Sequence, residues 1–211
     1  MRAMALGYAR GDALRRMRDL VLASIGLLLA TPIFILVVLA NIKEPQNAFF
    51  VHKRIGLRGR EFGCLKFRTM CVNADAQLAQ LLRSSAKARA EMQQFGKIEN
   101  DPRVTKLGRF LRRTSLDELP QLINVLRGEM SLVGPRPVTV EELCHYGKQK
   151  QLVLSVLPGL TGWWQVNGRN QKNYADRVEL DVWYVQNRCI WLDLRILVAT
   201  VWVVLCGRGA S

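Results

Sequence analysis

Histidine is scarce in this sequence, and its cysteines do not cluster. The 211 residues include 2 histidines and 5 cysteines. The cysteines are odd in number, widely spaced and never form a Cys-x-x-Cys pair. Because zinc sites and disulfide frameworks need clustered or paired ligands, this spacing argues against both. We expect free thiols that pack as small apolar side chains in a reducing compartment.

Acidic residues are few relative to basic ones. The chain has 17 Asp and Glu against 31 Lys and Arg, a formal net charge of +14, yet 49% of its residues are hydrophobic. A basic disordered tail lacks such apolar content and is excluded. The positive charge attracts phosphate in nucleic acid, in anionic lipid or in a phosphorylated substrate, and charge does not choose among them. The length predicts one domain with a real core.

One long segment carries no charge at all. Residues 20–42 read LVLASIGLLLATPIFILVVLANI, which is long enough as a helix to cross a bilayer. A cleaved signal peptide is disfavoured, because the residues that follow offer no small-x-small cleavage site. Pro32 removes one backbone hydrogen bond and kinks a helix, while the hydroxyl of Thr31 can satisfy a freed carbonyl. The segment is therefore expected to contact the membrane and to bend at Thr31 and Pro32.

The flanks of this segment favour a re-entrant helix, which leaves the membrane on the side where it enters. A spanning helix normally has its basic residues on one side only, whereas both flanks are basic here. A kinked spanning helix is the alternative. We expect residues 1–45 to form the membrane segment and residues 46–211 to form a compact body. The basic flanks comprise Arg10, Arg15, Arg16 and Arg18 before the segment, and Lys43, Lys53, Arg54 and Arg58 after it.

The body is expected to be mainly α-helical with minor β structure. Two β-prone pieces, residues 49–51 and 64–67, flank a basic, glycine-containing stretch and give a weak hairpin signal. Residues 72–95 contain no Gly or Pro and predict a helix. Residues 104–113 form a basic amphipathic segment, suited to a membrane surface or to an anionic substrate. Residues 189–206 predict an apolar helix that is interfacial or docked on the core, because Asp193 and Arg195 lie near its start.

Adjacent carboxylates, Asp117 and Glu118, stand at the expected start of a helix that runs toward Leu126. Two like charges raise each other's proton affinity, while a helix N-terminus and nearby arginines favour the ionised form. Such a pair can supply a nucleophile and bind a metal. The alternative is a capping box from Ser115 to Glu118. Pro120 weakens that alternative and predicts a helix that starts at residue 116 or 117.

Two further stretches contain residues suited to phosphate or nucleotide binding. Arg136 lies between two prolines, and such a stiff backbone suits bidentate phosphate recognition, although a structural turn is the simpler interpretation. Residues 158–170, PGLTGWWQVNGRN, interleave glycines with aromatic and amide side chains. Aromatic rings can stack on a base and amides can pair with its edge, or the tryptophans can anchor a loop at the bilayer interface. The candidate nucleotide-binding residues are Gln165, Asn167 and Arg169.

Together these stretches resemble the bacterial sugar transferase family, in particular its small monotopic phosphoglycosyl transferases, which are related to undecaprenyl-phosphate galactose or glucose phosphotransferases. The order of the motifs is specific, although each motif by itself is not. The family usually has Ser-Pro where this chain has Thr31 and Pro32, and the hydroxyl is retained. The matching segments are residues 66–70, 100–103, 107–137, 158–170 and 180–194, together with the N-terminal apolar segment.

The resemblance implies a re-entrant membrane helix followed by a compact α-rich catalytic body with amphipathic helices on the membrane surface. It also implies that a carboxylate attacks the β-phosphate of a UDP-sugar, releases UMP, and passes the phosphosugar to a polyprenyl phosphate. Asp117 corresponds to the nucleophile and Glu118 to its partner, with Mg²⁺ as the expected metal at both. By the same resemblance, the phosphates are held by Lys66, Arg112 and Arg136, and Asp193 belongs to the polar active site.

The expected partners are a UDP-sugar, a polyprenyl phosphate and the inner leaflet of the bacterial cytoplasmic membrane, with no nucleic acid; a homo-oligomer is compatible with this expectation. The product would initiate a surface glycan. The length of residues 72–99 resembles hexose-phosphate transferases and favours a hexose. Two rival classes are a membrane-tethered nucleic-acid-binding protein, which leaves the carboxylate pair without a role, and a membrane scaffold without catalysis.

Overall fold

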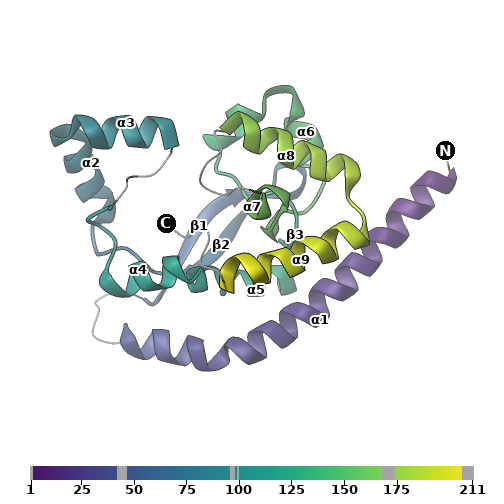
Figure 1. Cartoon of the computed structure of the whole chain (residues 1–211), viewed down its shortest axis with the longest axis horizontal. Helices are drawn as coiled ribbons and strands as arrows, with labels where there is room; N and C mark the ends of the chain where they lie inside the picture. The colour runs from purple at the N-terminus through teal and green to yellow at the C-terminus, as the bar shows by residue number, and fades with distance from the viewer. Residues whose placement is uncertain (1, 42–46, 96–97, 99, 168–173, 206–211) are drawn as a thin grey trace.

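The computed structural model describes residues 2–41, 47–95, 98, 100–167 and 174–205. Figure 1 shows a mainly helical body with short strands at its centre and one long helix along its edge, which confirms the expected fold class. The long helix, α1, spans Arg2–Ala40. The C-terminal helices α8 (Tyr174–Asn187) and α9 (Ile190–Leu205) cover other faces of the same body.

Helix α1 is continuous and visibly curved, with Pro32 inside it. The Thr31 hydroxyl donates to the carbonyl oxygen of Leu27 at 3.0 Å, whereas the carbonyl that Pro32 leaves without an amide donor is that of Leu28. Its residues 12–40 are long and apolar enough to cross a membrane. Among residues 12–40, four side chains at helical spacing are buried against the body, and most of the remaining apolar side chains are exposed. The buried four are Asp19, Ala23, Ala30 and Val37.

The weak hairpin signal is confirmed, and the strands are longer than the sequence predicts. Strands β1 (Phe49–Ile55) and β2 (Glu61–Phe67) pair antiparallel, with Phe49 opposite Phe67 and Ile55 opposite Glu61. A short 3-10 helix, η1 (Leu57–Gly59), connects them. Because side chains alternate along a strand, Cys64 and Lys66 project from the same face of β2.

The predicted helix over residues 72–95 is broken. Helices α2 (Ala74–Ser84) and α3 (Ala86–Phe95) are separated by Ser85, whose backbone is extended. The pair projects from the body in Figure 1. Helix α4 (Lys106–Arg113) follows, and the Thr105 hydroxyl accepts a hydrogen bond from the Gly108 amide as its N-terminal cap.

The start of the helix after the carboxylate pair was predicted wrongly. Asp117 and Glu118 lie in a separate 3-10 helix, η2 (Leu116–Glu118), and α5 (Gln121–Arg127) begins only after Pro120. Ser115 has a positive φ of 57° and its side chain makes no capping hydrogen bond, so the capping-box alternative does not hold. Proline supplies the reason, because its lack of an amide hydrogen is harmless only before or in the first turn of a helix.

A second strand pair, which is parallel, lies within the body. Strands β3 (Ser131–Val133) and β4 (Gly159–Thr161) pair in register, Ser131 with Gly159 and Val133 with Thr161. Between them lie the 3-10 helix η3 (Glu142–Gln149) and helix α6 (Lys150–Val153), and α7 (Trp163–Val166) follows β4. The main core packs α1, α5, both of these strands, α8 and α9 together through residues that include Ala23, Val125, Met130, Tyr184 and Ile196.

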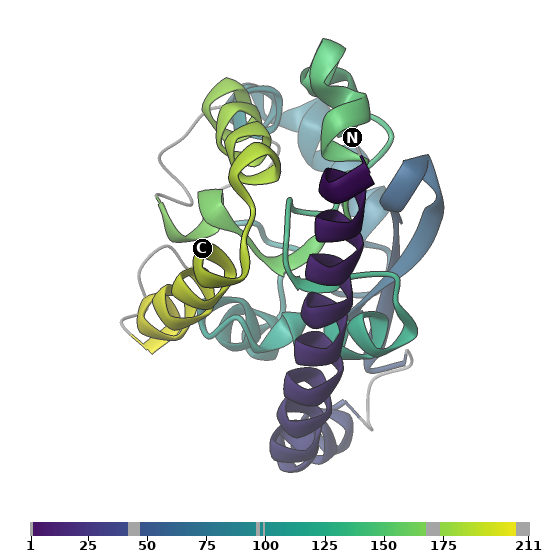
Figure 2. The same cartoon turned by 90° about the vertical axis from the view of Figure 1, so that its right-hand side faces the viewer.

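Helix α9 is docked on the core along one side and exposed along the other, which combines the two expectations for this segment. Ile196 and Asp193 are fully buried, whereas Trp191, Val198 and Trp202 are 77%, 71% and 64% exposed. Figure 2 shows α9 and α1 on neighbouring sides of the body. A surface that exposes such large apolar side chains is typical of membrane contact.

Candidate active site

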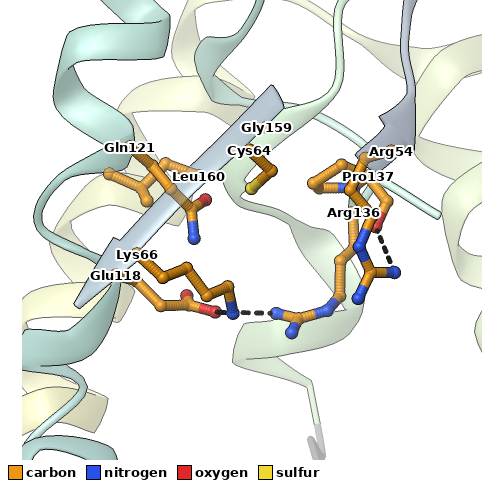
Figure 3. A pocket seen from close by; sticks show the side chains of 9 residues that line it. All are labelled: Arg54, Cys64, Lys66, Glu118, Gln121, Arg136, Pro137, Gly159 and Leu160. Atoms are coloured by element: carbon orange, nitrogen blue, oxygen red, sulfur yellow. Dashed lines mark hydrogen bonds and ion pairs between the residues drawn. The ribbon is translucent and has the colours of Figure 1, made fainter. Parts of the chain in front are cut away.

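The candidate active site is a small pocket between β1, β2, η2 and the segment that follows β3 (Figure 3). It encloses about 220 Å³, part of which is open to solvent. Three residues that the sequence singled out meet here although they are far apart along the chain. They are Lys66, Glu118 and Arg136.

Glu118 lies between two cationic side chains. Its Oε1 accepts a hydrogen bond from Lys66 Nζ at 2.7 Å and another from Arg136 Nη1 at 3.3 Å. The three side chains are between 19% and 29% exposed, so solvent screens the ion pairs only partly. Figure 3 shows both cations directed at the same carboxylate oxygen. An incoming phosphate can compete with Glu118 for these cations, because it offers the same kind of acceptor.

Helix α5 fixes the position of Lys66 through a buried amide. The Asn124 side chain is fully buried; its Oδ1 accepts from the Leu65 amide at 2.9 Å and its Nδ2 donates to the Gly63 carbonyl at 2.8 Å. These bonds satisfy backbone groups on the edge of β2 that faces away from β1. Lys66 is next along this strand, and α5 follows the turn that contains Glu118. One side chain therefore sets the spacing between the lysine and the carboxylate.

Arg136 is mounted on tightly packed backbone, as the flanking prolines predicted. Gly134 packs against Gly159 and Gly162 so closely that a Cβ atom on any of the three would overlap neighbouring backbone. The glycines of residues 158–162 thus let this segment lie close to the backbone that follows β3. The attraction of Glu118 raises the pKa of Arg136. The guanidinium is therefore charged and held at a fixed place.

Asp117 is next to this pocket and more buried than Glu118. It is 9% exposed, and among the described residues its carboxylate makes no ion pair within 4 Å. Burial raises the pKa of Asp117 and the neighbouring Glu118 raises it further, while Lys66, Arg112 and Arg136 act in the opposite direction. A carboxylate that is poorly solvated and not tied up in an ion pair retains the reactivity a nucleophile needs.

Arg112 approaches Asp117 from the last turn of α4. Its Nε donates to the Thr69 hydroxyl at 3.0 Å. Burial lowers the pKa of Arg112, and the negative charge of Asp117 is the largest influence that opposes this. Nearby, the buried Arg103 and Asp101 form an ion pair at 2.6 Å. Arg112 thus lies close enough to Asp117 for the two charges to influence each other.

Asp193 is not brought together with the other predicted site residues. It is fully buried and accepts hydrogen bonds from Arg15 at 3.0 Å, Arg18 at 2.8 Å and the Tyr184 hydroxyl at 2.7 Å. Arg18 also binds Asp19, whose other oxygen accepts from the Ser131 hydroxyl. The network ties α1 to α9 and β3. Asp193 thus lies in this helix-anchoring cluster, and its part in the polar active site stays a prediction.

The candidate nucleotide-binding amides both bond to backbone carbonyls of their own segment, Gln165 as a buried residue and Asn167 as an exposed one. Gln165 is 5% exposed and its Nε2 donates to the Leu160 carbonyl at 3.1 Å, while Asn167 donates to the Trp163 carbonyl at 2.8 Å. Both amides thus serve α7 and its surroundings. Arg169 lies outside the described residues. Trp163 stacks on Trp183 at 4.8 Å between ring centroids, so it packs on α8 and is not an exposed bilayer anchor.

Sequence reasoning did not single out several other residues of this pocket. Strand alternation could have found two of them: Cys64 shares a face with Lys66, and Arg54 lies on the paired strand. Burial raises the pKa of the Cys64 thiol, which keeps it in the neutral form. Gln121, Pro137 and Leu160 have no such signal, because only tertiary packing brings them to the pocket.

The carboxylates present limit which metals fit. Within the described part of the chain, no group of three or more His, Cys, Asp or Glu side chains is arranged to hold an ion. Zinc and calcium normally use more protein ligands than this. Mg²⁺ binds through one or two carboxylates and completes its shell with water and substrate phosphates, so Asp117 and Glu118 fit that ion and need the substrate to complete the site.

A carboxylate pair that faces fixed cations, on a body with an exposed apolar helix, defines a phosphate-handling protein of the membrane surface. The bacterial sugar transferase family matches residues 10–207, and the chain belongs to that family.

Three relatives illustrate this membership. The chain is 47% identical to the UDP-galactose-lipid carrier transferase of Erwinia amylovora and 46% identical to the undecaprenyl-phosphate galactose phosphotransferase of Salmonella typhimurium, each over 93% of this chain and 41% of the relative. It is 45% identical to the exopolysaccharide production protein ExoY of Rhizobium meliloti, over 95% of this chain and 89% of that protein. The chain thus spans about two-fifths of the first two relatives and most of the third.

Proposed function

We propose that this protein transfers a sugar-1-phosphate from a UDP-sugar to a polyprenyl phosphate, with release of UMP, and so initiates a surface glycan. The observation that carries the proposal is the meeting of Glu118 with Lys66 and Arg136 at one pocket, with the buried Asp117 next to it in the chain and within the electrostatic influence of both cations. The names of the relatives support the donor, the lipid carrier and exopolysaccharide production as the context.

The reaction proceeds in two displacements at phosphorus. An oxygen of ionised Asp117 forms a bond to the β-phosphorus of the UDP-sugar, and the bond from that phosphorus to the bridging oxygen breaks, so UMP leaves with the electron pair. An oxygen of the polyprenyl phosphate then attacks the same phosphorus. The bond to Asp117 breaks, the carboxylate is restored, and polyprenyl-diphosphate-sugar forms.

The surrounding residues provide the electrostatics of both steps. Lys66 and Arg136 offset the charge of the diphosphate and of the departing UMP, which preserves the reactivity of the anionic nucleophile. Glu118 holds both cations in place before substrate arrives. Asp117 and Glu118 would hold Mg²⁺, which would supply further charge neutralisation for the phosphates.

The body lies on the cytoplasmic face of the inner membrane, with α1 re-entrant. Support comes from the way α1 packs: Ala23, which precedes Pro32, and Val37, which follows it, both contact the body. A helix that crossed the bilayer would carry one of these halves away from a body that stays in water. The exposed apolar sides of α1 and α9 give the lipid-facing surface.

The test is the conversion of Asp117 to Asn, which keeps the size of the side chain and removes its ionisable oxygen. With a panel of UDP-sugars and polyprenyl phosphate, we expect Asp117→Asn to lower UMP release by about 10³-fold or more, on the scale of losing a nucleophile. Mass spectrometry of the wild-type protein incubated with donor alone should show a gain of one phosphosugar, absent from the variant.

Asp75→Asn, on the projecting helix α2, is the matched control and should keep wild-type activity. UMP release by Asp117→Asn at the wild-type rate would refute the nucleophile. Salt-sensitive nucleic-acid binding without any turnover of UDP-sugars would refute the enzyme class.

A further inference from the structure

Helices α7 and α8 bring together buried polar atoms that the proposed reaction does not use. Trp164 Nε1, Arg177 Nε and Nη2, and Asp181 Oδ1 are all buried and have no hydrogen-bond partner among the residues that the structure describes. The Arg177 guanidinium lies over the Trp164 ring, 4.8 Å from its centroid, and 5.8 Å from the Tyr174 ring centroid. Asp181 is one turn further along the same helix face. A group of unpaired buried atoms is unfavourable for folding, and a ligand that pairs them is one reason to retain it.

This cluster adjoins the active-site pocket through Glu142. The Glu142 carboxylate binds Arg54, which lines the pocket, at 2.6 Å and accepts from the Tyr174 hydroxyl at 3.4 Å. Arg177 helps to lower the pKa of Glu142, and Arg136 helps to lower that of Asp181 against burial, which raises it to about 7. The cluster therefore lies on the Arg54 and Arg136 side of the pocket.

The donor and acceptor types restrict what can bind. Three of the unpaired atoms are N–H donors and one is a carboxylate acceptor. A phosphate or carboxylate ligand only accepts and would be repelled by Asp181, whereas a hydroxyl group both donates and accepts. Nε and Nη2 lie on one side of the planar guanidinium, so they match two oxygens on neighbouring carbon atoms. The Trp164 and Tyr174 rings offer apolar surface for the C–H face of a sugar.

We propose that Trp164, Arg177 and Asp181 form a subsite for a pair of neighbouring sugar hydroxyls of the donor. Arg177 donates to both hydroxyl oxygens, and one hydroxyl donates to Asp181 Oδ1. The Tyr146 hydroxyl donates to Asp181 Oδ2 at 2.7 Å and so fixes the carboxylate with Oδ1 left for the ligand. The inference rests on the proposed UDP-sugar donor, whose ribose and hexose both carry such hydroxyl pairs.

The experiment compares Asp181→Asn and Arg177→Lys with the wild-type protein and with Glu179→Gln, an exposed charge change on the same helix. For each protein, kcat/KM is measured with UDP-galactose, UDP-glucose and UDP-N-acetylglucosamine, and UMP binding is measured by competition. Both variants should lose about tenfold or more in kcat/KM for the preferred donor, as expected for a lost hydrogen bond to a charged group. Glu179→Gln should match the wild type.

The pattern across ligands identifies the sugar. If the hexose is bound, the preference among the three donors changes and UMP binding does not; if the ribose is bound, all donors and UMP weaken by the same factor. If kcat/KM for every donor and the affinity for UMP stay within twofold of Glu179→Gln in both variants, the subsite is overturned. If Asp181→Asn does not fold, Arg177→Lys alone gives the answer. A wild-type protein that turns over no donor would contradict the proposed function instead, and UMP binding by the variants would still be measured.

Discussion

At the scale of single residues, the two neighbouring carboxylates differ because their surroundings differ. Glu118 is paired with Lys66 and Arg136, whereas Asp117 is more buried and makes no such ion pair among the described residues. Burial and the charge of Glu118 both raise the pKa of Asp117. The adjacent pair thus separates into one residue that organises the cations and one that is suited to attack.

This difference predicts a change in the pH dependence of activity. The proposed reaction needs ionised Asp117, so wild-type activity should fall as the pH drops through its raised pKa. Glu118→Gln removes a negative neighbour and leaves Lys66 and Arg136 to stabilise the Asp117 anion. The pH at which activity falls should therefore be lower in this variant than in the wild type. The residual activity of Glu118→Gln, followed as kcat/KM against pH, measures the shift. If activity fell at the wild-type pH or at a higher one, the predicted effect of Glu118 on the pKa of Asp117 would be wrong.

At the scale of secondary-structure elements, the site depends on close contacts between backbone segments. Asn124 holds α5 against the edge of β2, and Gly159 lets β4 approach the segment that carries Arg136. Neither contact is catalytic. Each sets the distance between a cation and the carboxylate that it faces.

The glycine contact can be tested by adding one methyl group. In Gly159→Ala the new Cβ would overlap the Gly134 amide nitrogen and the Thr161 carbonyl, so β4 must move away from β3. We expect a stability loss of about 1–3 kcal/mol, together with a loss of activity as Arg136 shifts. Thermal unfolding and UMP release measure the two effects.

Gly59→Ala is the matched control, because its Cβ meets open space and only its positive φ of 77° adds strain. It should lose some stability and keep its activity. Wild-type stability and activity in Gly159→Ala would show that the close packing is not needed.

At the scale of the whole molecule, helix α1 is fastened to the body that carries the candidate site. The buried cluster of Asp193, Arg15 and Arg18 fastens α1 to α9, and Arg16 binds the last carbonyls of α5. Buried ion pairs contribute little net stability but are costly to break singly, so they fix one arrangement of the helices. The site and the lipid-facing surface therefore keep a constant relation to each other.

The arrangement predicts the topology of the chain. An epitope tag at the N-terminus and a second tag inserted at the exposed turn Leu57–Gly59 should lie on the same, cytoplasmic side, because both halves of α1 pack on one body. Protease protection of each tag in sealed inverted vesicles and in spheroplasts provides the measurement. Tags on opposite sides of the membrane would mean that α1 spans it.

The sequence by itself determined the features that depend on neighbours along the chain. The uncharged run with Pro32, the basic excess, the hairpin and the carboxylate pair are of this kind, and the motif order gave the family. The tertiary structure decided which residues meet. It joined Lys66, Glu118 and Arg136, moved Asp193 to the anchor of α1, and revealed Arg54 and Arg177. The reason is physical: periodicity and propensity act over a few residues, whereas burial, charge pairing and backbone contacts depend on folds that bring distant segments together.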